Sequence, residues 1–235
     1  MGRDVGAEVL QAEKIAKRFT DTLALDGVDF EVRAGEVHVL IGENGAGKST
    51  LVKIITGVYS PDAGTIRIHG CPVRLASPQR ARELGIAVIY QELTVVPELS
   101  VAENLFLARQ PRRFGFIDWA RIRRESVGLL ERVGLHVNPT TPVRELGIGQ
   151  RQLVEIVRAV DLDAKVLILD EPTAALTGTE TDQLLKIIAD LRQQGVGLVL
   201  ITTACRNADT SPTGSPCCAT AAASVCCLPA RASRR

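Results

Sequence analysis

The sequence lacks an excess of either charge, because its 235 residues include 28 basic and 27 acidic side chains. A formal net charge of +1 provides no overall field that would attract nucleic acid or an anionic surface. No apolar run approaches the roughly 18 residues of a membrane-spanning helix, and residues 1–16 lack the apolar core of a signal peptide. We therefore expect a cytoplasmic protein. The 46% hydrophobic content excludes wholesale disorder, and the length allows one domain or one domain with a subdomain.

Cysteine is nearly absent before the C-terminal segment. Only Cys71 precedes residue 205, and the other five are Cys205, Cys217, Cys218, Cys226 and Cys227. The adjacent pairs do not match the C-x2-C spacing of metal sites, and a disulfide framework is not expected without an export signal. The cysteines therefore predict neither a metal centre nor a disulfide scaffold.

The apolar pattern predicts strands that alternate with helices, and no internal repeat is present. Strands are predicted at 28–33, 37–41, 65–68, 86–90, 166–169 and 195–202. Helices are predicted at 48–58, 101–108, 119–133, 150–160 and 180–193. Residues 98–160 are mostly helical and form a predicted insertion. The alternation indicates an α/β fold with a largely parallel sheet.

A glycine-rich segment follows the predicted strand 37–41 and precedes the predicted helix 48–58. It reads Gly42-Glu43-Asn44-Gly45-Ala46-Gly47-Lys48-Ser49 and fits the pattern G-x-x-x-x-G-K-[ST]. Glycines allow the backbone N–H groups to wrap phosphate oxygens, and the helix start favours negative charge. The segment therefore predicts a nucleotide phosphate site, in which Lys48 reaches the β- and γ-phosphates and Ser49 ligates Mg²⁺.

Two carboxylates end the predicted strand 166–169. Asp170 and Glu171 follow four apolar residues directly. In a doubly wound sheet the carboxyl end of such a strand lies beside the phosphate loop. We therefore expect Asp170 to hold Mg²⁺ through water and Glu171 to polarise the attacking water.

Together these segments resemble the ATP-binding cassette (ABC) proteins, especially the ATP-binding subunits of bacterial importers for ribose, xylose and galactose. The resemblance runs from about Leu10 to Thr202. It is carried by the segments 42–50, 88–93, 100–107 and 170–177. It implies a P-loop NTPase fold with a β-rich N-terminal part, a RecA-like core and a helical subdomain at about 92–150. Residues 1–202 would form the nucleotide-binding domain.

The resemblance implies roles for individual residues. Phe19 would stack on adenine, and Gln91 and Glu171 would be catalytic. Mg²⁺ would be held by Ser49, Gln91 and Asp170. The ATP phosphates would be bound by Gly42, Glu43, Asn44, Gly45, Ala46, Gly47, Lys48, Ser49 and Thr50.

A second glycine-containing segment occupies the place of the family's signature loop. It reads Leu146-Gly147-Ile148-Gly149-Gln150, with Gly147 where the family usually has serine. The resemblance implies that this loop closes on the γ-phosphate of ATP bound to a second cassette. The glycine removes one hydroxyl donor and leaves the backbone donors.

The resemblance also implies partners and a location. These are a membrane permease contacted through residues 91–107, a second cassette, and indirectly a sugar-binding protein, with no nucleic acid. The chain would be peripheral on the cytoplasmic side of the bacterial inner membrane. Two alternatives stay open: a soluble cassette protein of translation or DNA repair, and a non-catalytic nucleotide-binding fragment.

The chain after Thr202 departs from the resemblance. The family has a histidine where Thr203 stands, and from Ala204 onward Ile, Phe, Lys, Glu and Gln are all absent. One base added before the codon of Thr203 permits His-Arg-Leu-Pro-Glu-Arg-Arg-Tyr-Ile-Ala-Asp-Arg-Val-Thr-Val-Leu-Arg-Asp-Gly. That string resembles the family's histidine loop and following strands. We therefore expect residues 203–235 to be an out-of-frame, disordered tail, and ATP hydrolysis to be impaired.

Overall fold

The computed structural model describes residues 6–20, 22–43, 45–90, 94–107, 109–161, 164–173 and 176–202, and the backbone of 223–227. Contacts divide the chain into two units. The first comprises Met1–Val88, Lys165–Glu171 and Leu191–Arg235, and the second comprises Ile89–Ala164 and Pro172–Asp190. The second unit is thus wider than the subdomain expected at 92–150. Strands and helices alternate along the chain, as predicted for an α/β fold.

The first unit contains an antiparallel sheet built on two long strands. Its order is β2-β1-β4-β5, with β1 Glu8–Phe19, β2 Thr22–Arg33, β4 Ala63–Ile68 and β5 Cys71–Val73. In β2 the buried Phe30 and Val32 alternate with the exposed Glu31 and Arg33, so one face packs on the core.

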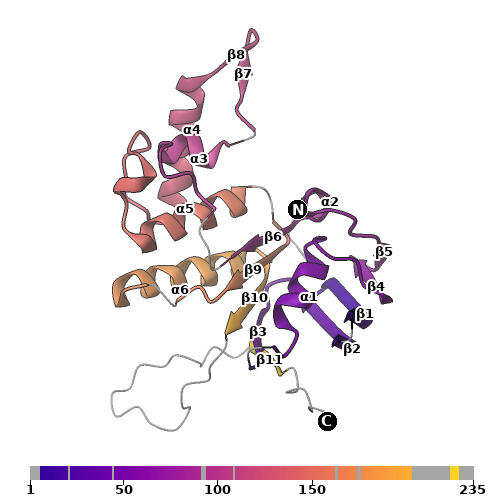
Figure 1. Cartoon of the computed structure of the whole chain (residues 1–235). Helices are drawn as coiled ribbons and strands as arrows, with labels where there is room; N and C mark the ends of the chain where they lie inside the picture. The colour runs from indigo at the N-terminus through magenta and orange to yellow at the C-terminus, as the bar shows by residue number, and fades with distance from the viewer. Residues whose placement is uncertain are drawn as a thin grey trace, which may run out of the picture. The chain divides into compact units, whose positions relative to one another are not determined.

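The second sheet of this unit is largely parallel and carries the predicted buried strands. Its order is β11-β3-β10-β9-β6, with β3 Val37–Ile41, β6 Ile86–Ile89, β9 Val166–Asp170, β10 Gly197–Thr202 and β11 Ala223–Cys227. The strands β9, β10 and β3 pair in parallel side by side (Figure 1). The helix α1, Lys48–Ile55, buries Leu51 and Ile54 in a core that both sheets share. A short helix, α2 Pro78–Glu83, was not predicted.

One part of the expected disordered tail is ordered. Strand β11 pairs in parallel with β3, so that Ala223 is aligned with Val37 and Cys227 with Ile41. The structure therefore has a strand at residues 223–227, where a disordered tail was expected. The physical reason is that β3 would otherwise be an open sheet edge, which accepts any short extended segment of strand-compatible residues. The rest of 203–235 lies outside the described residues.

The second unit consists of packed helices and one small hairpin. Its elements are α3 Val101–Leu105, the hairpin β7 Arg112–Arg113 and β8 Phe116–Ile117, α4 Trp119–Arg132, a 3-10 turn at Val143–Glu145, α5 Ile148–Asp161 and α6 Gly178–Gln193. Helices α3, α4 and α5 contact one another and bury Leu105, Ile122 and Ile156. Each helix starts within two residues of its predicted position. The hairpin was not predicted, because strands of two residues show no readable period. No helix in the described part of the chain could span a membrane.

Candidate nucleotide-binding site

Three chain segments leave the parallel sheet at one edge. Thr202 of β10 is aligned with Ile41 of β3, and Ile201 is aligned with Asp170 of β9. The glycine-rich loop after Ile41 and the carboxylates after Leu169 therefore follow β3 and β9, the two strands of the first unit that flank β10. The sequence predicts that the two segments lie at one edge, and the carboxyl edge of a parallel sheet is where α/β proteins bind ligands.

The glycine-rich loop needs glycine for two physical reasons. Gly45 has φ 86° and Gly47 has φ 95°, both in the left-handed region that other residues rarely adopt. A Cβ atom on Gly47 would also lie 2.7 Å from the carbonyl oxygen of Ala24. Gly47 caps α1 directly, so the loop turns tightly and exposes the start of the helix. Asn44 lies outside the described residues.

Lys48 is held where its charge can act on this loop. Its side chain is 6% exposed, and Nζ donates a hydrogen bond to the carbonyl of Glu43 at 3.0 Å and another to the carbonyl of Gly42. The first turn of α1 contains no acidic residue, and Ser49 is exposed there. The loop therefore offers a positioned ammonium group and free helix donors, which together suit an anion such as a polyphosphate.

The two carboxylates differ in their surroundings. Partial burial raises the pKa of Asp170 above its usual value, the adjacent Glu171 raises it further, and Lys48 opposes both effects. Glu171 has φ 48°, an uncommon conformation for this residue type, and its N–H donates to the carbonyl of Ile201 at 3.0 Å. A partly buried carboxylate beside a second one favours a cation. Asp170 and Ser49 are therefore suitable oxygen donors for Mg²⁺.

Phe19 ends β1 and belongs to an aromatic pair. Its half-buried ring packs edge-on against Tyr59, with ring centroids 5.2 Å apart, and the ammonium of Lys17 lies 5.6 Å from its centroid. Tyr59, which follows α1, was not predicted as part of the site. The signal available was its position one turn after the helix of the phosphate loop in a chain with few aromatic residues.

Gln91 lies outside the described residues, and Thr94, the first described residue after it, is hydrogen-bonded to helix α5. Glu155 of α5 is 3% exposed and accepts hydrogen bonds from the backbone N–H and the hydroxyl of Thr94, the latter at 2.6 Å. Arg158, one turn further along α5, also donates to the Thr94 hydroxyl, at 2.5 Å. Glu155 was not predicted. A charged residue on the apolar face of α5 was the available signal.

The signature-like loop, Leu146–Gln150, lies in the second unit. Leu146 is buried, Ile148 is 56% exposed, and the N–H of Gly147 donates to Oε1 of Gln150 at 3.2 Å. A Cβ atom on Gly149 would lie 2.2 Å from the carboxylate of Glu180 in α6. Nothing approaches a Cβ position on Gly147 closer than 4.0 Å.

Comparison with known families matches residues 25–174 to the family described as ABC transporter. Similar curated proteins include a ribose import ATP-binding protein of Streptomyces coelicolor, 56% identical over 195 residues, which cover 83% of this chain and 38% of that protein. Another is a putative ribose/galactose/methyl galactoside import ATP-binding protein of Burkholderia ambifaria, 51% identical over 86% of this chain and 39% of that protein. The chain thus spans about two fifths of the length of these relatives.

Solved structures show the same fold. A nucleotide-free ATP-binding cassette of an ABC transporter superposes with a TM-score of 0.73, at 28% identity over 83% of this chain and 81% of that chain. A cassette from Clostridium perfringens, described as part of an ABC transporter complex, gives a TM-score of 0.70 at 28% identity, over 84% of this chain and 78% of that chain. These similarities confirm the predicted P-loop NTPase fold class.

Proposed function

Because the chain belongs to the ABC transporter family, we propose that it is an ATP-binding and ATP-hydrolysing cassette that energises a bacterial sugar importer. The observation that carries this proposal is the shared edge of the sheet in the first unit, where the loop that leads from β3 to Lys48 and the end of β9 at Asp170 lie on the two sides of β10. The relatives named for ribose or galactose import support a sugar as the transported substrate. The protein would act at the cytoplasmic face of the inner membrane.

In this mechanism the phosphate loop binds and orients ATP. The backbone N–H groups around Gly45 and Gly47 surround the phosphates, and Lys48 exchanges its carbonyl partners for β- and γ-phosphate oxygens. Phe19 stacks on adenine, supported by Tyr59. Mg²⁺ bound by Ser49, Gln91 and Asp170 would neutralise charge on the transferred phosphoryl group.

Glu171 and Gln91 act on the attacking water. Glu171 is held at the end of β9 by its N–H bond to Ile201 and would accept a proton from that water. Gln91 would contact the same water and respond to the permease through residues 91–107. No covalent enzyme intermediate is needed, because positioning and electrostatic stabilisation supply most of the catalysis.

A second cassette completes the site. The loop Leu146–Gln150 would close on the γ-phosphate of ATP bound to that cassette, through the donors at the start of α5. Closing and opening of the ATP sandwich would switch the permease between its access states. We also attribute residues 203–235 to a shifted reading frame, since Thr203 follows β10 where the family has its histidine. Hydrolysis would therefore be slow.

The test is ATP turnover and ATP affinity in the full chain and in the variant Glu171→Gln. We expect the variant to bind ATP like the parent and to lose residual turnover by at least about a hundredfold, since a positioned base contributes roughly that factor. Equal turnover in both proteins would exclude Glu171 as the catalytic base. Binding without any turnover in the parent would favour the alternative of a non-catalytic fragment.

A second measurement tests the transport assignment. Affinity purification from bacterial membranes should recover a polytopic permease together with this chain. Recovery of ribosomal or DNA-repair components without a permease would favour a soluble cassette protein instead. Sequencing of the DNA around the codons of Thr202 and Thr203 would show whether a one-base shift restores the histidine.

A further inference from the structure

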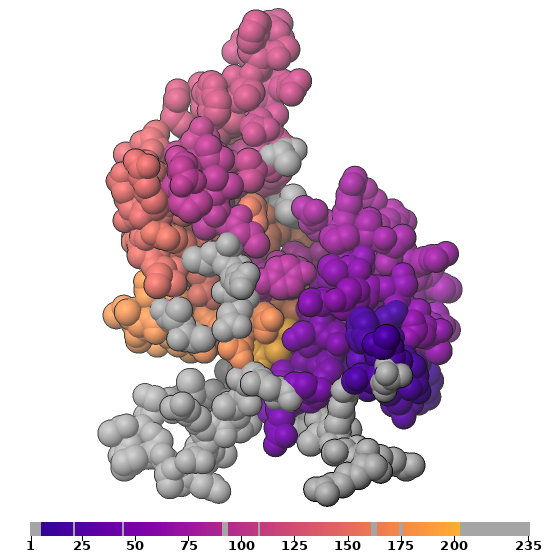
Figure 2. All heavy atoms as spheres, in the orientation of Figure 1, coloured from indigo at the N-terminus to yellow at the C-terminus, as the bar shows by residue number. Residues whose placement is uncertain are grey.

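The hairpin β7–β8 concentrates exposed aromatic side chains. Phe114 is 88% exposed, Phe116 is 80% exposed, and Trp119, the first residue of α4, is 43% exposed. The chain has only eight aromatic residues, and three of them lie within these six positions. Exposed apolar clusters of this kind mark interaction sites in soluble proteins. The hairpin protrudes from the end of its unit, beyond α4 (Figures 1 and 2).

The turn of this hairpin is not optimised for its own stability. Arg113 pairs with Phe116, and the two residues between them, Phe114 and Gly115, have φ 52° and φ 87°. Turns with two positive φ values favour Asn or Asp before Gly, whereas phenylalanine is strained in that backbone conformation. Since the Phe114 ring is not buried in return, its presence indicates a contact outside this chain.

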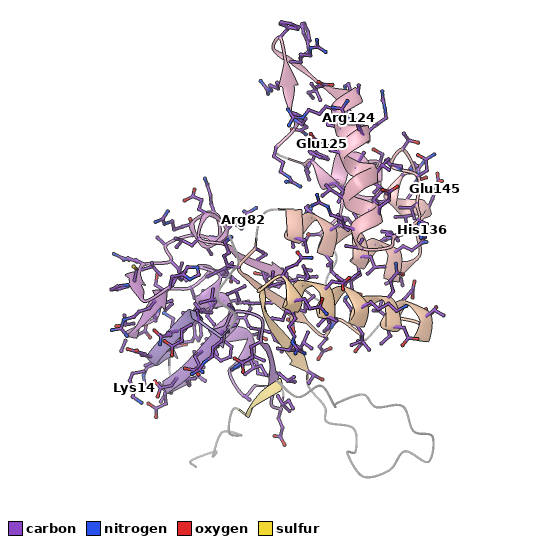
Figure 3. All side chains as sticks on the ribbon, turned by 180° about the vertical axis from the view of Figure 1, so that it is seen from behind. Lys14, Arg82, Arg124, Glu125, His136 and Glu145 are labelled. Atoms are coloured by element: carbon purple, nitrogen blue, oxygen red, sulfur yellow. The ribbon has the colours of Figure 1, made fainter. Side chains whose placement is uncertain are left out.

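The surroundings of the hairpin are strongly basic. Residues 109–124 contain six arginines and one aspartate, a net charge of +5, although the whole chain has a net charge of only +1. Arg112 and Arg113 are exposed and form no ion pair among the residues that the structure describes. The guanidinium of Arg113 lies 5.5 Å from the centroid of the Phe114 ring. Arg124 lies on α4 near the base of the hairpin (Figure 3).

The base of the hairpin is rigidly joined to the helix. The N–H of Asp118 donates to the carbonyl of Pro111 at 2.9 Å, and the Asp118 carboxylate caps α4 by accepting from the N–H of Arg121 at 3.0 Å. These hydrogen bonds fix the aromatic tip and the arginines beside it at the start of α4.

We propose that the hairpin β7–β8 is a peripheral attachment site for an anionic phospholipid surface. A convex tip of aromatic rings flanked by arginines can enter the headgroup region of a bilayer, where aromatic side chains and cations are both stabilised. A protein partner would need a concave apolar pocket surrounded by acidic groups. The attachment is independent of nucleotide binding and adds to the proposed function.

The test uses the full chain and its single tryptophan, Trp119, as a probe at the base of the hairpin. The vesicles consist of phosphatidylcholine alone or of equal parts phosphatidylglycerol and phosphatidylcholine. We expect Trp119 emission to shift to shorter wavelength with the anionic vesicles only, and brominated phosphatidylglycerol to quench it. Co-sedimentation gives the partition coefficient.

Two variants separate the contributions. Arg112→Gln with Arg113→Gln should lower the partition coefficient on the order of thirtyfold, because each cation near an anionic surface contributes a factor of about five. Phe114→Asn with Phe116→Thr should lower it by at least about tenfold. Asn suits the turn, so this variant should unfold at or above the parent's midpoint. Arg74→Gln with Arg82→Gln, both exposed in the first unit, is the charge-matched control and should bind as the parent does.

The proposal is overturned if the parent does not bind anionic vesicles, or if the hairpin variants bind them as the parent does. It is also overturned if Trp119 responds to a detergent-solubilised permease and not to vesicles, since the hairpin would then contact protein. ATP affinity, measured on the same samples, should be unchanged in the hairpin variants. A parent that binds vesicles and fails to bind ATP would count against the proposed function alone.

Discussion

The chain contains two glycine-rich helix starts that look alike in sequence and differ in construction. The phosphate loop before α1 has glycines in left-handed conformations and a buried lysine that contacts the loop's own carbonyls. The signature-like loop before α5 has no lysine, and neither Gly147 nor Gly149 has a left-handed φ. The first loop can therefore surround a phosphate alone, whereas the second presents only the start of a helix.

The difference shows that glycine serves separate purposes in the two loops. Gly47 is required by its backbone conformation and by the close carbonyl of Ala24. At Gly149 a Cβ atom would meet only the carboxylate end of the Glu180 side chain, which can move, and at Gly147 a Cβ atom would meet nothing closer than 4.0 Å.

The largest effect is expected from removing the lysine side chain, which only the phosphate loop has. Lys48→Ala should weaken ATP binding by more than about a hundredfold, because two charge-assisted contacts to phosphate are lost. Equilibrium titration measures this change. Lys186→Ala, on the exposed face of α6, is the matched control and should leave the affinity unchanged. An affinity within threefold or so of the parent's would contradict the assignment of this loop.

A glycine-to-alanine series tests the structural difference between the loops. Gly47→Ala should lower the free energy of unfolding by at least about 1–2 kcal/mol, because a left-handed alanine is strained. Gly149→Ala should cost about 1 kcal/mol, because Glu180 must leave its hydrogen bonds to Thr177 at the start of α6. Gly147→Ala should be neutral or slightly stabilising. Urea unfolding checks the order, and an equal loss at all three positions would remove the distinction.

Restoring the family's hydroxyl should make the second loop bind phosphate more tightly. The structure leaves room for a side chain at position 147, so Gly147→Ser is expected to fold normally. A hydroxyl bond to an anionic phosphate should strengthen ATP-dependent pairing of cassettes by about tenfold or more. Sedimentation at saturating ATP, in the Glu171→Gln background, measures the pairing. No gain would mean that the backbone donors suffice or that the loop does not close on nucleotide.

The smallest expected effect concerns the charge at the edge of the sheet. The pKa of Asp170 is raised in the folded state, so the folded protein binds this proton more tightly than the unfolded chain. The resulting stabilisation is present below the ordinary aspartate pKa of 3.8 and is lost as the pH rises through the folded value. Asp170→Asn should therefore raise the thermal midpoint at pH 7, without nucleotide or Mg²⁺, and the gain should shrink on acidification.

The control for this prediction is Asp190→Asn, which changes an exposed carboxylate on α6. It should leave the midpoint unchanged at both pH values. A midpoint for Asp170→Asn at or below that of the parent at pH 7 would show that the carboxylate does not oppose folding. That result would weaken its assignment as a Mg²⁺ ligand.

The sequence alone predicted the fold class, which the similar structures confirm, and it predicted the glycine-rich loop and the paired carboxylates at strand ends. Their apolar strands and fixed glycine spacing are local patterns, and a parallel sheet brings the ends of such strands to one edge whatever the rest of the chain does.

Tertiary structure alone decided the rest. Tyr59 joined Phe19, and Glu155 anchored Thr94, only because segments distant in sequence pack together. Residues 223–227 became a strand because β3 offered an unpaired edge, which composition does not reveal. The preference for glycine at 149 likewise depends on the position of the Glu180 side chain. Contacts of this kind depend on which surfaces meet in space, and local sequence patterns do not record that.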